Sequence, residues 1–108
     1  MIDKRKEIGT ILNELGIYPN LLGYKYIIDA IQICVNDVKI NSIHKQIYPD
    51  IGNRYDTEPS RVERAIRHAI SISWTKKYIQ YHDIFRNYYK RPKNKELIYT
   101  IADRIRFI

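Results

Sequence analysis

The feature that most constrains the fold is an apolar stripe with helical spacing in the first half of the chain. Its members recur every three or four residues over four turns: Tyr24, Ile27, Ile28, Ile31, Cys34, Val35 and Val38. Side chains at this spacing share one face of an α-helix, so the segment predicts an amphipathic helix. Because the stripe keeps its spacing over four turns, we expect this helix to form the centre of the core.

Helical spacing recurs along the rest of the chain, and no segment alternates polar and apolar residues as a half-buried strand does. The other predicted helical segments are 8–15, 43–47, 49–55, 59–74, 78–89 and 94–105. A chain of 108 residues suits one domain. We therefore expect a single, compact all-α domain over residues 1–108.

Residues at the ends of these segments fit helix caps. Gly16 follows the first stripe and suits the left-handed residue after a helix. Short polar side chains that accept backbone N–H groups precede the other helices. The predicted N-caps are Asn20, Asn41 or Ser42, Thr57 and Asn94.

The net charge of +7 is unevenly distributed along the chain. Residues 1–39 and 96–108 each carry equal numbers of cationic and anionic side chains, whereas 40–95 carry twelve Lys and Arg against five Asp and Glu. Clustered cations favour a polyanion as partner, because they release the counterions condensed around phosphates. The alternative is ordinary charge that keeps the surface soluble.

The single cysteine, Cys34, excludes an intrachain disulfide and favours a reducing compartment. It lies on the apolar stripe, so we expect a small buried hydrophobe and not a nucleophile. The N-terminus mixes charges with apolar residues, unlike a signal peptide, and no run approaches membrane-spanning length. A cytoplasmic protein without a membrane partner is expected.

Residues 49–74 combine a short helix, a polar turn and a longer helix, which is the order of a helix-turn-helix. The longer helix contains SRVERAIRHAI at 60–70 and has two contrasting sides. Its packing side carries Val62, Ala65, Ile66, Ala69 and Ile70, whose small alanines allow close packing on the preceding helix. Its polar side carries Ser60, Arg64, Arg67, His68 and Ser71, with Arg61 and Glu63 on the flanks.

This polar side offers groups that a DNA major groove accepts. An Arg fork bonds O6 and N7 of guanine, and a Glu accepts from N4 of cytosine. The competing interpretation is a solvated surface helix in which Glu63 and Arg67 form an i, i+4 ion pair. Candidates for flanking phosphates, which position the protein without specifying sequence, are Arg67, His68, Lys76 and Lys77.

Catalysis and metal binding have no support in the sequence. The histidines have no partner at metal-ligand spacing, and the carboxylates between Asp50 and Glu63 occupy a turn and a helix start, where they complement the helix dipole. No nucleophile has a recognisable base, and no glycine-rich phosphate loop is present. We therefore expect no enzyme, no metal and no cofactor.

Ten tyrosines raise the hypothesis that bases of RNA or single strands stack on this protein. Tyr24 and Tyr55 lie on predicted core stripes, where tyrosine mostly packs. Tyr88 and Tyr89 belong to the basic loop YYKRPKNK at 88–95 and are candidates for phosphate or partner contacts.

Several segments resemble one known family. SRVERAIRHAI at 60–70, with YPDI at 48–51 and Trp74, is similar to the C-terminal DNA-binding effector domain of the stage-zero sporulation response regulators. The similarity runs from about Ile8 to Arg106. Its flanking parts are ILNELGIYPNLLGYKYIIDAI at 11–31, VND at 35–37 and ELIYTIADRIR at 96–106.

The resemblance implies a six-helix domain with a helix-turn-helix that binds short promoter boxes of double-stranded DNA, in the family roughly TGTCGAA. It implies a sporulation-type transcription regulator, associated with the nucleoid. By matching position, Arg64 would read a guanine and Glu63 a cytosine. The other implied contacts are to bases or nearby backbone by Arg67 and His68, and to phosphates at the helix start by Ser60 and Arg61.

The resemblance weakens over residues 75–91, and FRNYYKRP at 85–92 is shorter than the family pattern. In the family this region contacts the sigma subunit of RNA polymerase and a neighbouring copy of the domain in tandem. The family's receiver domain has no counterpart in these 108 residues. Two alternatives to an activator therefore stay open: a receiver-less competitor for the same boxes, and an interaction module that uses the predicted helix 78–89 for polymerase or self-association.

Overall fold

The computed structural model describes residues 2–107, and within that range it holds five α-helices and no strand. The π-helical turn Ile43–Ile47 runs into α3, and two 3₁₀ turns follow α4 at Ile79–Tyr81 and Asp83–Phe85. The all-α prediction is confirmed, whereas five α-helices and these turns stand in place of six helices. The α-helices are α1 Arg5–Glu14, α2 Leu22–Asn36, α3 Tyr48–Arg54, α4 Pro59–Thr75 and α5 Asn94–Arg106.

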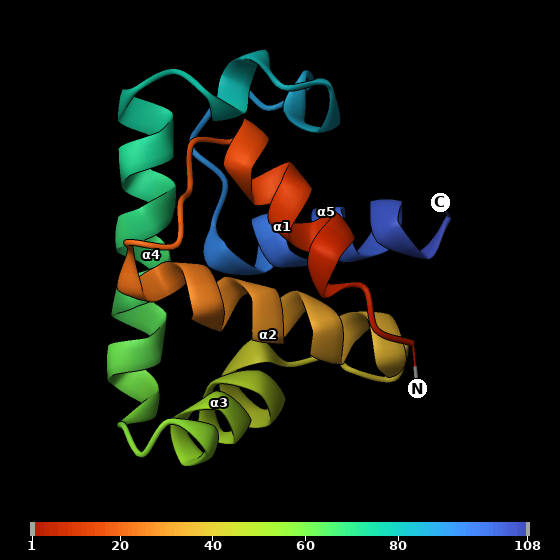
Figure 1. The fold of residues 1–108 in the computed structure, drawn as a ribbon, viewed down its shortest axis with the longest axis vertical. Coiled ribbons are helices and arrows are strands. Elements are labelled where there is room, and N and C mark those ends of the chain that lie inside the picture. The colour runs from red at the N-terminus through yellow and green to blue at the C-terminus, as the bar shows by residue number, and fades with distance from the viewer. Residues whose placement is uncertain (1, 108) are drawn as a thin grey trace.

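Helix α2 forms the centre of the fold (Figure 1). α4 crosses one end of α2, α3 lies on one side of it, and α1 and α5 lie on the other side. Ile27 and Ile31 on α2 are fully buried, and Cys34 is 1% exposed. The predicted stripe is therefore confirmed up to Val35. Val38 is 75% exposed, because α2 ends at Asn36 and the chain turns at Val38 and Lys39.

The crossing of α2 and α4 depends on a glycine. A Cβ on Gly23 would lie 2.3 Å from the carbonyl oxygen of Ala65 and 3.0 Å from Cβ of Ala69. Any side chain at this position would therefore push the two helices apart. The two alanines, which were expected to allow close packing on the preceding helix, allow the approach of α2 instead.

The predicted caps are confirmed at two of the helix ends. Gly16 has a φ of +70°, as a left-handed residue after α1 requires, and Ser42 Oγ accepts the N–H of Lys45 at 3.2 Å. The other three N-cap predictions are wrong, because each of these helices begins at a different residue. The N-caps that replace Asn20, Thr57 and Asn94 are Leu21, Glu58 and Lys93.

The prediction of a helix over residues 78–89 is wrong, because the segment folds as two 3₁₀ turns. Lys77, with a φ of +66°, ends α4 and turns the chain. Ile79 and Phe85 are both fully buried. Six residues apart, they would lie about 120° apart around an α-helix, wider than the separation of residues three or four positions apart.

A buried carboxylate connects three helices below the core. Asp29 on α2 is 2% exposed and accepts hydrogen bonds from Arg5 Nη1 at 2.6 Å and from Tyr55 Oη at 2.5 Å. Arg54 Nη1 lies 4.0 Å from the same carboxylate. Burial, and then the hydrogen bond to Asp29, raises the pKa of Tyr55 to about 12. The start of α1 and the end of α3 are thereby fixed to α2.

The two ends of the described chain lie on the side of the molecule away from α4 (Figure 1). The N-terminal segment is held to α2, since the side-chain oxygens of Asn36 and Gln32 accept the N–H groups of Ile2 and Lys4. At the other end, the Arg106 guanidinium donates to a carbonyl oxygen of α2.

Candidate nucleic-acid interface

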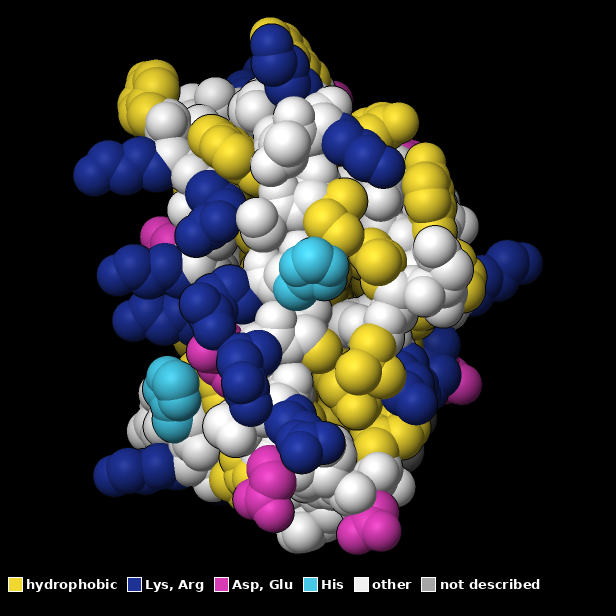
Figure 2. Space-filling model, turned by 90° about the vertical axis from the view of Figure 1, so that its left-hand side faces the viewer, with side chains coloured by type: hydrophobic (Ala, Val, Ile, Leu, Met, Phe, Trp, Pro, Cys, Tyr) yellow, Lys and Arg dark blue, Asp and Glu magenta, His cyan; other side chains and the backbone are white. Residues whose placement is uncertain are grey.

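The outward face of α4 carries most of the predicted DNA-reading side chains, and the opposite face is buried. The face is reached directly from solvent, and Figure 2 shows Lys and Arg side chains gathered on this side of the molecule, with few carboxylates among them. The division of the helix into a packing side and a polar side is therefore confirmed. The exposed polar side chains in the first three turns of α4, called the α4 strip below, are Ser60, Arg61, Arg64, Arg67 and His68.

Glu63 lies at the edge of the α4 strip and is half-buried. Its Oε2 accepts a hydrogen bond from Arg67 Nε at 3.0 Å, which is the i, i+4 pair expected from the spacing. A pair of this kind on a helix surface contributes about 0.3–0.5 kcal/mol, because solvent screens it. Either side chain can therefore leave the other for a base at small cost.

Three predicted site residues lie outside the α4 strip. Ser71 is half-buried, and Lys76 and Lys77 are exposed just beyond the end of α4. With a rise of 1.5 Å per residue, Lys77 lies about 20 Å along the helix axis from Arg64. The structure therefore does not bring these lysines together with the start of the helix.

The connection between α3 and α4 is tight. Asp56 adopts a φ of +52°, and the N–H of Thr57 donates to the carbonyl oxygen of Gly52 at 2.9 Å. A Cβ on Gly52 would lie only 2.6 Å from the carbonyl oxygen of Thr57. This backbone contact fixes where α4 begins relative to α3.

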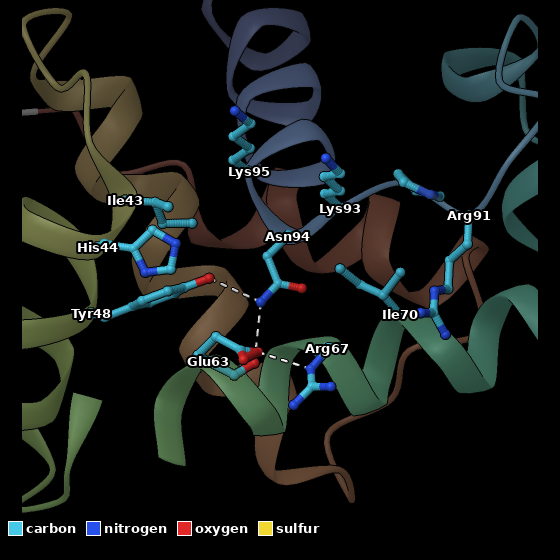
Figure 3. Close-up of a pocket in the computed structure, with 11 residues that line it drawn as sticks. Ile43, His44, Tyr48, Glu63, Arg67, Ile70, Arg91, Lys93, Asn94 and Lys95 are labelled. Carbon is cyan, nitrogen blue, oxygen red and sulfur yellow. Dashed lines mark hydrogen bonds and ion pairs between the residues drawn. The ribbon is translucent and has the colours of Figure 1, made fainter. Parts of the chain in front are cut away.

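A groove of about 590 Å³ opens along the Glu63 side of α4 (Figure 3). Its apolar lining includes Ile70 and Tyr48, and burial raises the pKa of Tyr48. The Asn94 side-chain amide donates to Tyr48 Oη at 2.9 Å and to the Glu63 carbonyl oxygen at 3.1 Å. The start of α5 is thereby joined to α3 and α4.

Besides Arg67, four basic side chains line this groove. They are His44 from the π-helical turn, Arg91 from the loop before α5, and Lys93 and Lys95 around the first turn of α5. Sequence reasoning recognised the basic loop, but it had no signal for its position. That position depends on the path of the chain after Phe85, which brings the loop back to α4.

The opposite side of α4 has a shallower hollow of about 410 Å³. Its lining combines Arg61, Arg64 and His68 of the α4 strip with the start of α2. Leu22 at the start of α2 is 56% exposed. Outside α4, the lining of this second hollow is therefore apolar, whereas that of the first groove carries cations.

Residues 8–105 match the family model described as the C-terminal domain of the sporulation initiation factor Spo0A. The chain belongs to this family. The matched range contains α2, α3 and α4 entirely, most of α1 and nearly all of α5. The resemblance seen in the sequence is therefore confirmed, and the family identifies a DNA-binding domain of a sporulation transcription factor.

The Spo0A C-terminal family is a family of regulatory DNA-binding domains and not of enzymes. The one cysteine fits this assignment, since burial raises the pKa of the Cys34 thiol to about 11 and keeps it protonated. Within residues 2–107, no three His, Cys, Asp or Glu side chains lie close enough to hold a metal ion. No helix of that range is long and apolar enough to cross a membrane.

Proposed function

We propose that this chain binds double-stranded DNA sequence-specifically, with α3 and α4 as a helix-turn-helix and the α4 strip in the major groove. The observation that carries the proposal is the exposure of five polar side chains on the first three turns of α4, while the other side packs on α2 and α3. In helix-turn-helix proteins the N-terminal residues of the second helix contact base edges. The tight connection at Gly52 and Thr57 supports this role for α3.

The proposed contacts follow the distance of each side chain from the start of α4. Arg64, in the middle of the α4 strip, reads a guanine, and Glu63 reads a cytosine after leaving Arg67. Arg67 and His68 contact bases or nearby backbone. The proposed phosphate contacts are Ser60 and Arg61 at the helix start, and Ser71, Lys76 and Lys77 towards its end.

The proposed biological role is regulation of transcription at short promoter boxes of the sporulation type, at the nucleoid. A second copy of the domain in tandem and the sigma subunit of RNA polymerase are the proposed protein partners. A second candidate function, protein docking through residues 76–91, is favoured by Tyr81 and Tyr89, which are 79% and 93% exposed. The other alternative, a receiver-less competitor, would occupy the same boxes without activating.

The test is a titration of wild type and Arg64→Ala against a TGTCGAA duplex and a scrambled duplex, at two salt concentrations. Arg64→Ala should lose about 1–3 kcal/mol of binding free energy and relax discrimination at one guanine. Lys76→Ala should weaken both duplexes alike and flatten the salt dependence. Arg104→Ala, which removes an exposed arginine of α5 near the C-terminal end of the chain, is the matched control.

Equal affinity of the wild type for the two duplexes would contradict the proposal. Preference for single strands would favour base stacking on tyrosines instead. Transcription in vitro from a promoter with the box separates activation from competition, since only an activator raises the transcript level.

A further inference from the structure

The α4 strip has a hollow on each side, and the two hollows differ in charge. On the Glu63 side, Arg91, Lys93 and Lys95 face the groove, together with His44. On the other side, the part of the wall outside α4 consists of residues 21–23, which carry no charge. The lining outside α4 is therefore cationic in one hollow and uncharged in the other.

The cations of the groove wall are available to a ligand. Arg91, Lys93 and Lys95 are exposed, and none of them forms an ion pair within the range that the structure describes. The one carboxylate of the groove lining, Glu63, is bound to Arg67. The nearby Glu96 carboxylate accepts the backbone N–H of Lys93 at 2.8 Å. Figure 3 shows Arg91 extended towards α4, with Lys93 and Lys95 beside the first turn of α5.

A helix in the major groove of DNA has a sugar–phosphate backbone on each side. The groove is about 12 Å wide and an α-helix with its side chains is about 10–12 Å across. The elements that flank α4 therefore meet the two backbones. A cationic flank attracts the phosphates it meets, because each neutralised phosphate releases condensed counterions.

We infer that Arg91, Lys93 and Lys95 bind the backbone phosphates of one DNA strand, on the Glu63 side of α4. The inference rests on the proposed function and extends it to residues outside the helix-turn-helix. Because the lining outside α4 is cationic on this side only, the contact to the phosphates is one-sided. It positions α4 in the major groove, while the base contacts of α4 decide which way the domain points along an asymmetric box.

The experiment compares three forms of the protein by fluorescence anisotropy with the same two duplexes. The first is wild type and the second is the triple variant Arg91→Ala, Lys93→Ala, Lys95→Ala. The third is a charge-matched control, which removes exposed cations elsewhere: Lys6→Ala, Lys39→Ala and Arg104→Ala. Circular dichroism melting verifies that all three are folded.

Loss of three phosphate contacts lowers the slope of log affinity on log salt by about 2.7. Raising salt from about 50 to 200 mM should then weaken wild type about forty-fold more than the triple variant. The ratio between box and scrambled duplex should stay the same, since phosphate contacts do not read sequence. The conservative variant Arg91→Lys, Lys93→Arg, Lys95→Arg should restore the wild-type slope.

Methylphosphonate substitution locates the contact. Neutral linkages are placed at successive positions beside the box, on one strand at a time. A set of positions on one strand should weaken wild type but not the triple variant, whereas positions that meet the other phosphate contacts should weaken both. An unchanged slope in the triple variant, or a change equal to that of the charge-matched control, would overturn the inference. Calorimetry with inorganic pyrophosphate adds a second check. Tight binding that the triple variant loses, with an unchanged DNA slope, would assign the groove to a small anion and likewise overturn it.

The outcome is distinguishable from failure of the proposed function. If wild type prefers the box but the triple variant keeps its slope, only the role of the groove fails. If wild type does not distinguish the duplexes, the proposed sequence reading fails, whatever the slope of the triple variant.

Discussion

The two ends of α4 are held in different ways. Its N-terminal half is fixed by backbone contacts and directional bonds, namely the tight approach at Gly23, the Gly52–Thr57 hydrogen bond and the two bonds of Asn94. Its C-terminal end runs through a left-handed residue into turns that depend on two buried side chains, Ile79 and Phe85.

The direction of the N-terminal half of α4 is therefore fixed, whereas the segment that follows α4 is held mainly by its buried side chains. Side chains that read bases need a fixed direction, which backbone contacts and hydrogen bonds provide. Burial of Ile79 and Phe85 anchors the segment after α4. A contact between His82 Nε2 and Glu14 Oε1 at 2.8 Å adds to this anchoring, and the exposed side chains of the segment can change without altering the fold. That is the part of the chain where the resemblance to the family is weakest.

Removal of a buried side chain from the turns after α4 has the largest expected effect on stability. Phe85→Ala removes a fully buried aromatic side chain and should lower the free energy of unfolding by about 3–5 kcal/mol. Urea denaturation followed by circular dichroism measures it. A loss below about 1 kcal/mol would mean that the turns are not anchored by this residue.

A substitution that forces α2 and α4 apart tests the contacts that fix the N-terminal half of α4. Gly23→Ala places a methyl group against the Ala65 carbonyl and should lower stability by about 1–3 kcal/mol, with a loss of DNA affinity as α4 shifts. Gly9→Ala is the matched control, since its Cβ would meet only the end of the Tyr24 side chain at 3.0 Å. The control should be neutral or stabilising by up to about 1 kcal/mol. An equal change in stability in the two variants would mean that the crossing of α2 and α4 does not require a glycine at position 23.

The buried Asp29 carboxylate should contribute a smaller amount to the free energy of unfolding. Asp29→Asn weakens the contacts to Arg5 and Tyr55 and should lower stability by about 1–2 kcal/mol, because Arg5 is half-exposed and solvent screens its charge. Chemical denaturation at pH 7 measures this loss, and unchanged stability would deny Asp29 a structural role.

Tyr55, which is partly buried and donates to the same carboxylate, predicts that stability depends on pH in the alkaline range. In the folded protein the pKa of Tyr55 is raised to about 12, above its ordinary value of about 10, so the folded state holds this proton more tightly. The stabilisation is complete below pH 10 and is lost as the pH rises from about 10 to 12. The stability difference between wild type and Tyr55→Phe should narrow over that interval, and a constant difference would contradict the assignment.

The exposed aromatic side chains of the turns after α4 should contribute least to the stability of the fold. Tyr81→Ala should change the free energy of unfolding by less than about 0.5 kcal/mol and leave DNA affinity unchanged. A large loss of stability would show that the surface of this segment is part of its anchoring. A loss of polymerase binding without either change would favour the docking function.

The sequence alone predicts the elements whose burial follows a helical period. The helix predicted over 59–74 is α4, Pro59–Thr75, and its division into two sides follows directly from the spacing of Val62, Ile66 and Ile70. The pairing of Glu63 with Arg67 is equally local. Spacing predicts these features because each depends on residues only three or four positions apart.

Features that depend on distant parts of the chain are not predictable in this way. Thr57 is a good N-cap by residue type, but its backbone bonds to Gly52 and the helix begins later. Asn94 likewise directs its side chain to Tyr48 and the Glu63 carbonyl and does not cap α5. The groove beside α4 joins segments near residues 44, 67 and 93, and only the fold brings them together.

The position of the chain ends has a practical consequence. Both lie away from α4, so an attachment at either end leaves the α4 strip open. A dye, a surface tether or a second copy joined by a flexible linker could be placed there without covering the groove. Linker length in such a tandem then becomes an adjustable variable, which sets the spacing between boxes that two joined copies can occupy at once.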